Sequence, residues 1–272
     1  MTKTPFLKMH GTGNDFVVLD ARAQPLVVDA ALAQRLCHRH FGIGCDTLVV
    51  LQPPQQGGDV AVAFYNADGS QSPTCGNASR CVADLLMRER GVDAVQLETL
   101  AGLLPATRAA DGSITVNMGS PKLEWQQIPL AESRNTMHLG LQDGLLMDPV
   151  AVNMGNPHAI FFVRDLAHIK LAEAGPRLEH HPLFPQRANI SAVQVLAPDR
   201  LRMAVWERGA GLTMACGSAA CAAVVAGALR EVSLRKAAVE LPGGTLEVEW
   251  TAEGDVLMSG PVAYVFNGEI AI

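Results

Sequence analysis

The sequence has few aromatic residues and few charges for its length. Phe, Trp and Tyr make up 5% of the 272 residues and charged residues 18%, so few rings are present to stack on bases or sugars. Lysine and arginine number 21 against 27 acidic residues, which gives a net charge of -6, and no basic cluster interrupts the chain. Nucleic acid and anionic membrane surfaces are therefore not expected as partners. A small-molecule ligand is expected instead.

The chain also lacks a secretory signal and a long apolar run. Residues 1–15 carry charges and glycines where a signal requires an apolar segment. The longest run of small apolar residues, 215–229, contains two glycines and a serine and is too short to span a bilayer, so it predicts a buried helix. We expect a cytoplasmic protein, whose six cysteines are thiols rather than disulfides.

The second half of the chain repeats the first at an offset of about 141 residues. The matched positions are Gly13-Asn14 with Gly155-Asn156, Asn66 with Glu207, Cys75-Gly76 with Cys216-Gly217, Leu97-Glu98 with Val239-Glu240, Gly102 with Gly244, and 118–121 with 258–261. A constant register over so long a stretch predicts two copies of one fold, in domains 1–118 and 119–262. The stretch from Lys122 to Pro149, which has little periodicity, is expected to join them.

Periodicity gives the elements of each copy. Alternating or β-branched runs predict strands at 16–19, 47–51, 60–65, 114–116 and 201–206. One helix is capped by Asp29 and expected to stop at Gly42; two others run from Gly76 to Arg90 and from Gly217 to about Arg230. Because the last is apolar nearly all round, sheet must enclose it. The expected fold is α/β (α+β), with two pseudo-symmetric domains that each wrap a mostly antiparallel sheet around a central helix.

A cysteine stands immediately before each central helix, Cys75 before Gly76 and Cys216 before Gly217. A helix N-terminus offers unpaired N–H groups and a partial positive charge, which stabilise a thiolate and can hold a substrate carboxylate. Pseudo-twofold symmetry is expected to bring both helix starts face to face across the interdomain cleft. Two thiols on opposite sides of one carbon can remove a proton from one face and add one to the other. This pattern predicts stereo-inversion.

Two other chemistries fit the sequence less well. The cysteines at 75, 81, 216 and 221 could be four zinc ligands, but their spacing inside helices departs from the usual pattern. The glycines at 11 and 13 begin a dinucleotide fingerprint, yet Phe16 replaces the third glycine. We therefore expect no metal and no cofactor. Four cysteines are expected to be small buried hydrophobic residues: Cys37, Cys45, Cys81 and Cys221.

Polar residues lie at predicted loop positions around the two cysteines: Asn14, Asn66, Asn77, Asn156, His158, Asn189, Glu207 and Arg208. An isolated Asn is normally a turn residue. The charged pair Glu207-Arg208 closes an apolar strand, and a buried charge pair there requires a ligand or a partner. His158 is either a hydrogen-bonded core histidine or a group that tunes a cysteine.

Several segments together resemble the diaminopimelate epimerase family. They are residues 9–16, 66–70, 75–77, 153–158, 187–189, 207–211 and 215–217, and the likeness covers the whole chain in order. The resemblance implies two pseudo-symmetric domains, with a final strand, 263–272, that returns to the first. It also implies interconversion of LL- and meso-diaminopimelate without pyridoxal phosphate or metal, in lysine and peptidoglycan synthesis.

The resemblance also implies roles for single residues. Cys75 and Cys216 match the acid/base pair, and His158 and Glu207 match residues that modulate the thiols. Residues that match substrate contacts are Asn14, Asn66, Asn156, Asn189, Glu207 and Arg208, with Gly76-Asn77 and Gly217-Ser218 around the reacting carboxylate.

The chain departs from the family's pattern at four positions. Ala78 and Ala219 replace glycines inside the central helices, where Ala is the better helix former. Thr47 stands where a Gln often touches substrate, and Phe266 stands where a Tyr serves the dimer contacts of a homodimer.

Two other functions remain open at this point. One is a two-cysteine racemase of the same fold that acts on proline or hydroxyproline, which requires a small apolar pocket. The other is a metal-binding or ligand-binding protein without turnover.

Overall fold

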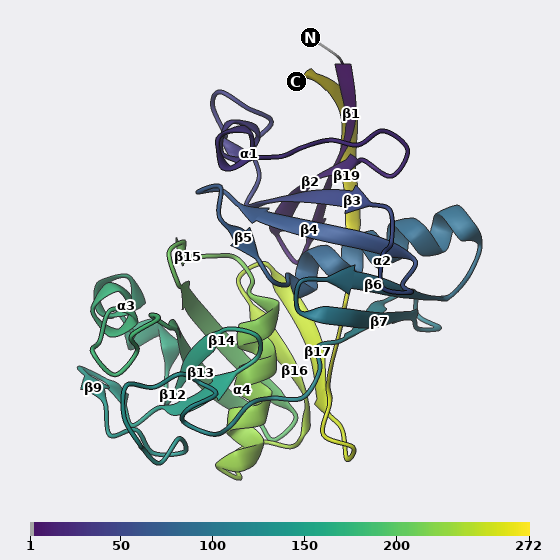
Figure 1. Cartoon of the computed structure of the whole chain (residues 1–272). Helices are drawn as coiled ribbons and strands as arrows, with labels where there is room; N and C mark the ends of the chain where they lie inside the picture. The colour runs from purple at the N-terminus through teal and green to yellow at the C-terminus, as the bar shows by residue number, and fades with distance from the viewer. Residues whose placement is uncertain (1–2) are drawn as a thin grey trace. The chain divides into compact units, whose positions relative to one another are not determined.

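The computed structural model describes residues 3–272, which form two compact units (Figure 1). Unit 1 runs up to Val116 and takes in Gly260–Ile272, and unit 2 is Asn117–Ser259. No helix in the described part of the chain is long and apolar enough to cross a bilayer.

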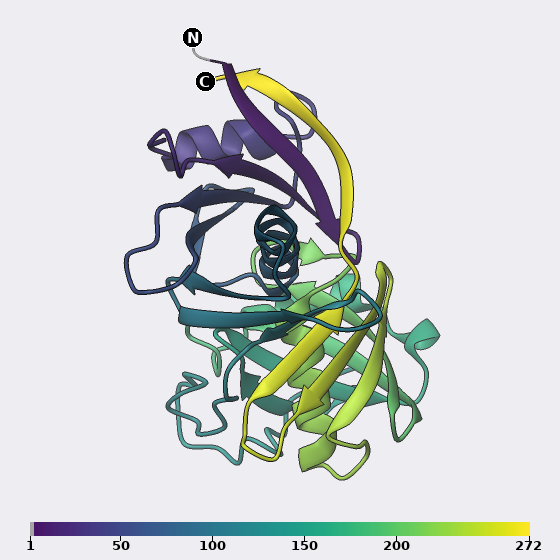
Figure 2. The ribbon, with the colours of Figure 1, turned by 90° about the vertical axis from the view of Figure 1, so that its right-hand side faces the viewer.

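Unit 1 is a sheet around one helix. Its strands are β1 (Lys3–Gly11), β2 (Asn14–Asp20), β3 (Thr47–Gln52), β4 (Val60–Asn66), β5 (Gln71–Ser72), β6 (Ala94–Thr99), β7 (Gly102–Arg108), β8 (Ile114–Asn117) and β19 (Ala263–Ala271). Strands β2 and β3 pair in parallel, as do β4 and β6, and the other pairs are antiparallel. The C-terminal β19 lies antiparallel beside β1 (Figure 1). Figure 2 views helix α2 (Gly76–Arg90) nearly along its axis, with strands of the unit around it.

Unit 2 repeats this order of pairing. Its strands are β9 (Gln142–Asp143), β10 (Leu146–Met147), β11 (Val150–Asn153), β12 (Pro157–Val163), β13 (Asn189–Ala197), β14 (Arg200–Glu207), β15 (Gly211–Leu212), β16 (Lys236–Leu241), β17 (Gly244–Trp250) and β18 (Val256–Gly260). The parallel pairs are β12 with β13 and β14 with β16, at the places that β2–β3 and β4–β6 hold in unit 1. The same connectivity in both units confirms the duplication predicted from the repeat.

Each unit has a short outer helix and a central helix. The outer helices, α1 (Ala30–Cys37) and α3 (Leu171–Glu179), lie between the parallel strands in sequence; a 3₁₀ turn η1 (Leu166–His168) precedes α3. The central helices are α2 and α4 (Gly217–Leu229). Helix α2 stops at Gly91, whose φ of 66° is the left-handed conformation that ends many helices. Helix α4 is buried on almost every side, as its uniformly apolar sequence predicts.

The predicted end of one helix was wrong. Helix α1 is capped by Asp29 as expected but ends at Cys37, not at Gly42. The chain turns back after His38, so a side chain at Gly42 would lie 2.0 Å from the Arg35 carbonyl oxygen. The glycine therefore serves the close return of the chain rather than the helix end.

The stretch from Lys122 to Pro149, which was expected to join the two copies, lies in unit 2. Ile128, Leu130, Leu139 and Leu146 are buried in the core of unit 2 together with residues of α3. These apolar side chains are scattered among turns, so no helical or strand period marks them in the sequence.

We predict that Gly175→Ala destabilises the protein. Ala in a helix interior is normally favoured over Gly by about 1 kcal/mol, but a Cβ at Gly175 would lie 2.5 Å from Cγ of Trp206 on β14. Overpacking costs about 1–3 kcal/mol, so the clash outweighs the helix propensity. Urea denaturation should show a lower free energy of unfolding for Gly175→Ala and no change for Glu173→Gln on the exposed face of α3. A stabilised Gly175→Ala variant would contradict this packing.

Candidate active site

Cys75 lies at the N-terminal end of α2, in an extended backbone conformation, with Gly76 as the first helical residue. Its sulfur, which is partly exposed, lies 4.0 Å from Oδ1 of Asn14 at the start of β2. The same Asn14 oxygen accepts a hydrogen bond of 3.3 Å from Nδ2 of Asn77 in the first turn of α2. Unit 1 therefore brings Cys75, Asn14 and Asn77 together.

Two residues that the sequence analysis missed hold this group in place. Arg80, which is fully buried, donates to Oδ1 of Asn77 at 3.0 Å and to Oγ1 of Thr12 at 3.1 Å. Asp46 accepts from Nδ2 of Asn14 at 2.9 Å. Arg80 follows Asn77 by one helical turn, which is a signal that the sequence contained; the contact of Asp46 with Asn14 has no local signal.

Thr47 and Asn66 lie opposite each other on β3 and β4. Thr47 is buried, and it also lies beside Phe16 of β2 in the parallel register. Asn66 is exposed at the end of β4, where its side chain donates to Ser70. Both therefore lie at the ends of neighbouring strands in unit 1.

In unit 2, Cys216 occupies the position at the start of α4 that Cys75 has on α2. Its sulfur lies 3.5 Å from Oγ of Ser218, and the residue is only 6% exposed. Burial raises the pKa of the Cys216 thiol well above its usual value, and the charge of Glu207 is the second largest cause of this increase. At neutral pH Cys216 is therefore a thiol.

Glu207 is the last residue of β14, and Arg208 begins the turn that follows. Gly209 has a φ of +78°, which a glycine adopts at no steric cost. Thr213 donates to the Glu207 carboxylate. The Arg208 amide donates to Oδ1 of Asn189 at 2.9 Å, so Asn189 positions the turn.

His158 is fully buried on β12 and lies beside Asn189 in the parallel register of β12 and β13. Its Nε2 lies 2.7 Å from Oδ1 of Asn156. An amide oxygen only accepts, so Nε2 carries the proton. Burial, followed by the charge of Arg208, lowers the pKa of His158 to about 3. His158 is therefore a buried, hydrogen-bonded histidine that is neutral at neutral pH.

The other four cysteines are buried in the two units. Cys37 and Cys45 lie with their sulfur atoms 3.5 Å apart in the core beside α1. Cys81 and Cys221 lie inside α2 and α4, and burial raises the pKa of Cys81 to about 12. Across residues 3–272, no three His, Cys, Asp or Glu side chains gather as a metal site requires.

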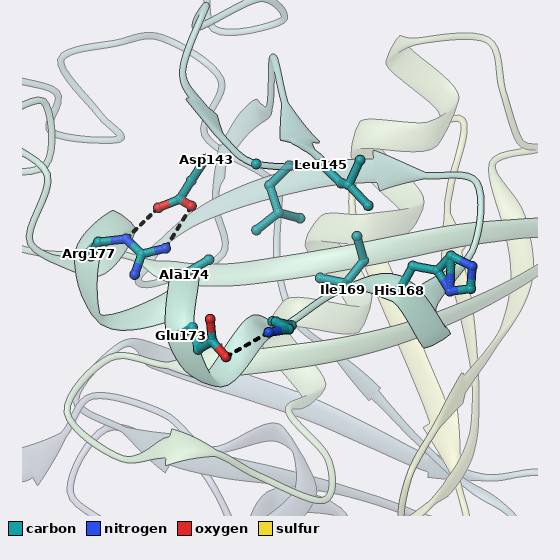
Figure 3. A pocket seen from close by; sticks show the side chains of 10 residues that line it. Asp143, Leu145, His168, Ile169, Glu173, Ala174 and Arg177 are labelled. Carbon is teal, nitrogen blue, oxygen red and sulfur yellow. Dashed lines mark hydrogen bonds and ion pairs between the residues drawn. The ribbon is translucent and has the colours of Figure 1, made fainter.

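A pocket of about 230 Å³ lies in unit 2 between the β9–β10 hairpin, η1 and α3 (Figure 3). Its two carboxylates are paired, Asp143 with Arg177 at 2.7 and 2.8 Å and Glu173 with Lys170 at 3.3 Å. Its lining contains none of the predicted site residues. We therefore do not associate this pocket with the chemistry of the cysteines.

The sequence matches a described family over most of its length. The diaminopimelate epimerase profile covers residues 6–124 and 150–265. The chain is 54% identical over 267 residues to the diaminopimelate epimerase of Rhodospirillum centenum, with 98% of this chain and 92% of that protein covered. It is 53% identical over 266 residues to the diaminopimelate epimerase of Acidiphilium cryptum, with 98% and 96% covered.

Solved structures share the fold at low sequence identity. A hydroxyproline epimerase from Agrobacterium vitis superimposes with a TM-score of 0.71 at 16% identity, covering 99% of this chain and 93% of that one. A PhzF-family phenazine biosynthesis protein from Bacillus anthracis gives a TM-score of 0.68 at 17% identity, with both chains fully covered. These structures confirm the expected fold class.

We predict that His158 makes stability depend on pH. Because its pKa falls from 6.5 to about 3 on folding, the unfolded chain binds the extra proton between these values. The stabilising contribution is therefore complete above pH 6.5 and is lost as the pH falls toward 3. Between pH 7.5 and pH 5 the loss is about 2 kcal/mol.

Urea denaturation at both pH values measures this contribution. His158→Gln keeps a donor for Asn156 but cannot be protonated. The difference in unfolding free energy between pH 7.5 and pH 5 should therefore be about 2 kcal/mol smaller in this variant. His168→Gln, at an exposed side chain, should keep the full difference. An unchanged pH dependence in His158→Gln would show that His158 is not buried in its neutral form.

Proposed function

The chain belongs to the diaminopimelate epimerase family, and from this premise we propose that Cys75 and Cys216 are the acid/base pair that inverts one carbon of the substrate. The protein is an isomerase that interconverts LL- and meso-diaminopimelate in lysine and peptidoglycan precursor biosynthesis. The observation that carries the assignment of the cysteines is their recurrence. Each cysteine lies at the start of the central helix of its unit and is followed by a glycine, and the strands of the two units have the same connectivity.

The two-base mechanism follows from what inversion requires. A proton leaves one face of the α-carbon while another arrives at the opposite face, which a single fixed base cannot do. We propose that the two cysteines act on the same carbon of the substrate. Cys216 begins as the acid, because burial and Glu207 raise its pKa and keep it protonated. Cys75, the less buried of the two residues, begins as the base, and the two roles exchange with each turnover.

Binding of the reacting end uses the two helix N-termini. The amides at Gly76-Asn77 and Gly217-Ser218 lie in the first turns of α2 and α4, where N–H groups and the helix dipole favour a carboxylate. We propose that both turns hold the α-carboxylate. The charge that develops on the carbon during proton removal is then delocalised toward these donors.

The distal end of diaminopimelate carries a second amino-acid head group. We propose that Arg208 binds its carboxylate and Glu207 its ammonium. The remaining contacts are assigned to Asn14, Thr47, Asn66, Asn156 and Asn189. His158 acts in its neutral form by orienting Asn156, and Glu207 also raises the pKa of Cys216; both therefore modulate the site.

We further propose a cytoplasmic location and a homodimer. Exposed apolar residues on β19 support the second proposal: Tyr264, Val265 and Phe266 are 42–53% exposed. The Phe266 ring lies edge-on against the buried ring of Phe6 on β1, with centroids 5.9 Å apart, so the apolar surface belongs to β19.

We predict that Cys75→Ala and Cys216→Ala each abolish epimerisation, because each thiol serves one face of the carbon. Loss of a general acid or base costs roughly 10²- to 10⁴-fold in rate. Chiral chromatography after incubation with LL- and meso-diaminopimelate measures the loss. Cys37→Ala, which changes a buried cysteine of α1, should remain active.

The same assay separates the alternative function. Turnover of L-proline or hydroxyproline in place of diaminopimelate would overturn the substrate assignment. Near-normal turnover in either alanine variant would remove that cysteine from the mechanism.

A further inference from the structure

Glu179, the last residue of α3, is a buried carboxylate that joins three segments of unit 2. It is 3% exposed. Its Oε2 accepts a hydrogen bond of 2.7 Å from the indole nitrogen of Trp206. Its Oε1 accepts from the Gly209 amide at 3.0 Å and from Nη1 of Arg187 at 3.3 Å. One side chain thus ties α3, the loop before β13 and the turn after β14 together.

The location of this carboxylate is set by close packing. Gly175, one turn earlier on α3, lets the helix approach Trp206 so closely that no Cβ fits between them. A buried carboxylate loses several kcal/mol of hydration and is retained only when donors replace the water. The indole, amide and guanidinium donors do this for Glu179. The charge is therefore part of a built and rigid arrangement.

Two of the three donors flank Arg208. Trp206 and Gly209 stand on either side of Glu207-Arg208 in the chain, so both ends of this segment are held by one carboxylate. The Arg208 guanidinium donates to the Gln186 carbonyl oxygen at 3.0 Å. Burial and the nearby Arg187 lower the pKa of Arg208, and Glu179 acts in the opposite direction. Glu179 therefore offsets the repulsion between two neighbouring guanidinium groups.

We propose that Glu179 is the positioning residue that fixes the turn from Trp206 to Gly209 and so presents Arg208 to the distal carboxylate of the substrate. This inference rests on the role proposed above for Arg208. Glu179 does not touch the substrate and acts only through the turn. Its contribution is to binding of the distal head group rather than to proton transfer at the cysteines.

Glu179→Gln tests this role, since it keeps the shape and removes the charge. Loss of a hydrogen bond to a charged group weakens binding by roughly ten- to hundredfold. We expect KM for meso-diaminopimelate to rise by about that factor, with kcat within about threefold of wild type. Glu173→Gln, on the same helix but in an exposed ion pair with Lys170, should leave both constants unchanged.

A double-mutant cycle shows whether Glu179 acts through Arg208. In an Arg208→Ala background, Glu179→Gln should raise KM no further, because the residue it positions is gone. A wild-type KM in Glu179→Gln, or effects that multiply in the double variant, would overturn the proposal. A proportionate loss of kcat with KM unchanged would also overturn it, since that assigns Glu179 to the chemical step.

Two further measurements test the role of Glu179 separately from the proposed function. Trp206→Phe retains an aromatic ring against Gly175 and removes one donor, so it should raise KM less than Glu179→Gln does; an unchanged KM would contradict the proposal even if Glu179→Gln does not fold. Calorimetry with meso-diaminopimelate and Cys75→Ala protein, with and without Glu179→Gln, measures the same loss of affinity without turnover. Unchanged affinity refutes the role of Glu179, whereas an inactive wild-type protein refutes the proposed function.

Discussion

The N-termini of the two central helices are the constraint on which the rest of the structure depends. Each buried helix begins at a cysteine in extended conformation whose side chain makes no capping hydrogen bond. Ser, Thr, Asp or Asn at that position contributes about 1 kcal/mol more than a poor cap. The chain gives up this stability at two equivalent places. The N–H groups of a first helical turn favour a carboxylate, which is the group that the proposed substrate carries at its reacting end.

Duplication gives each cysteine an equivalent set of neighbouring positions, and different residues at some of these positions make the two sets chemically unlike. Asn66 of unit 1 corresponds to Glu207 of unit 2, and Arg80, five residues after Cys75, corresponds to Cys221 after Cys216. In unit 1 the amide of Asn14 lies beside the cysteine and Asn77 is held by the buried Arg80, whereas unit 2 places the carboxylate of Glu207 near its thiol. The carboxylate of Glu207 favours the thiol form of Cys216, and a two-base mechanism requires one such thiol at the start of each turnover.

The features that could be predicted from sequence are those with local or periodic signals. The repeat, five of the strands and both central helices follow from hydrophobic period, caps and the constant offset. The end of α1 at Cys37 was mispredicted because the close return of the chain at Gly42 depends on tertiary packing. Glu179 was missed because its partners, Arg187, Trp206 and Gly209, lie 8 to 30 residues away. Side chains that position a site through such contacts leave no local pattern.

The account rests on proton transfer by two thiols on opposite faces, and isotope incorporation during the first turnovers in deuterium oxide tests it most directly. LL-diaminopimelate is incubated with reduced enzyme, and substrate and product are separated and analysed for deuterium. The account predicts that the meso product carries deuterium at the inverted carbon while recovered substrate keeps its hydrogen, since the thiol that donates to the product face has exchanged with solvent. Unlabelled product, or substrate labelled as fast as product forms, would show that one base serves both faces and would contradict it.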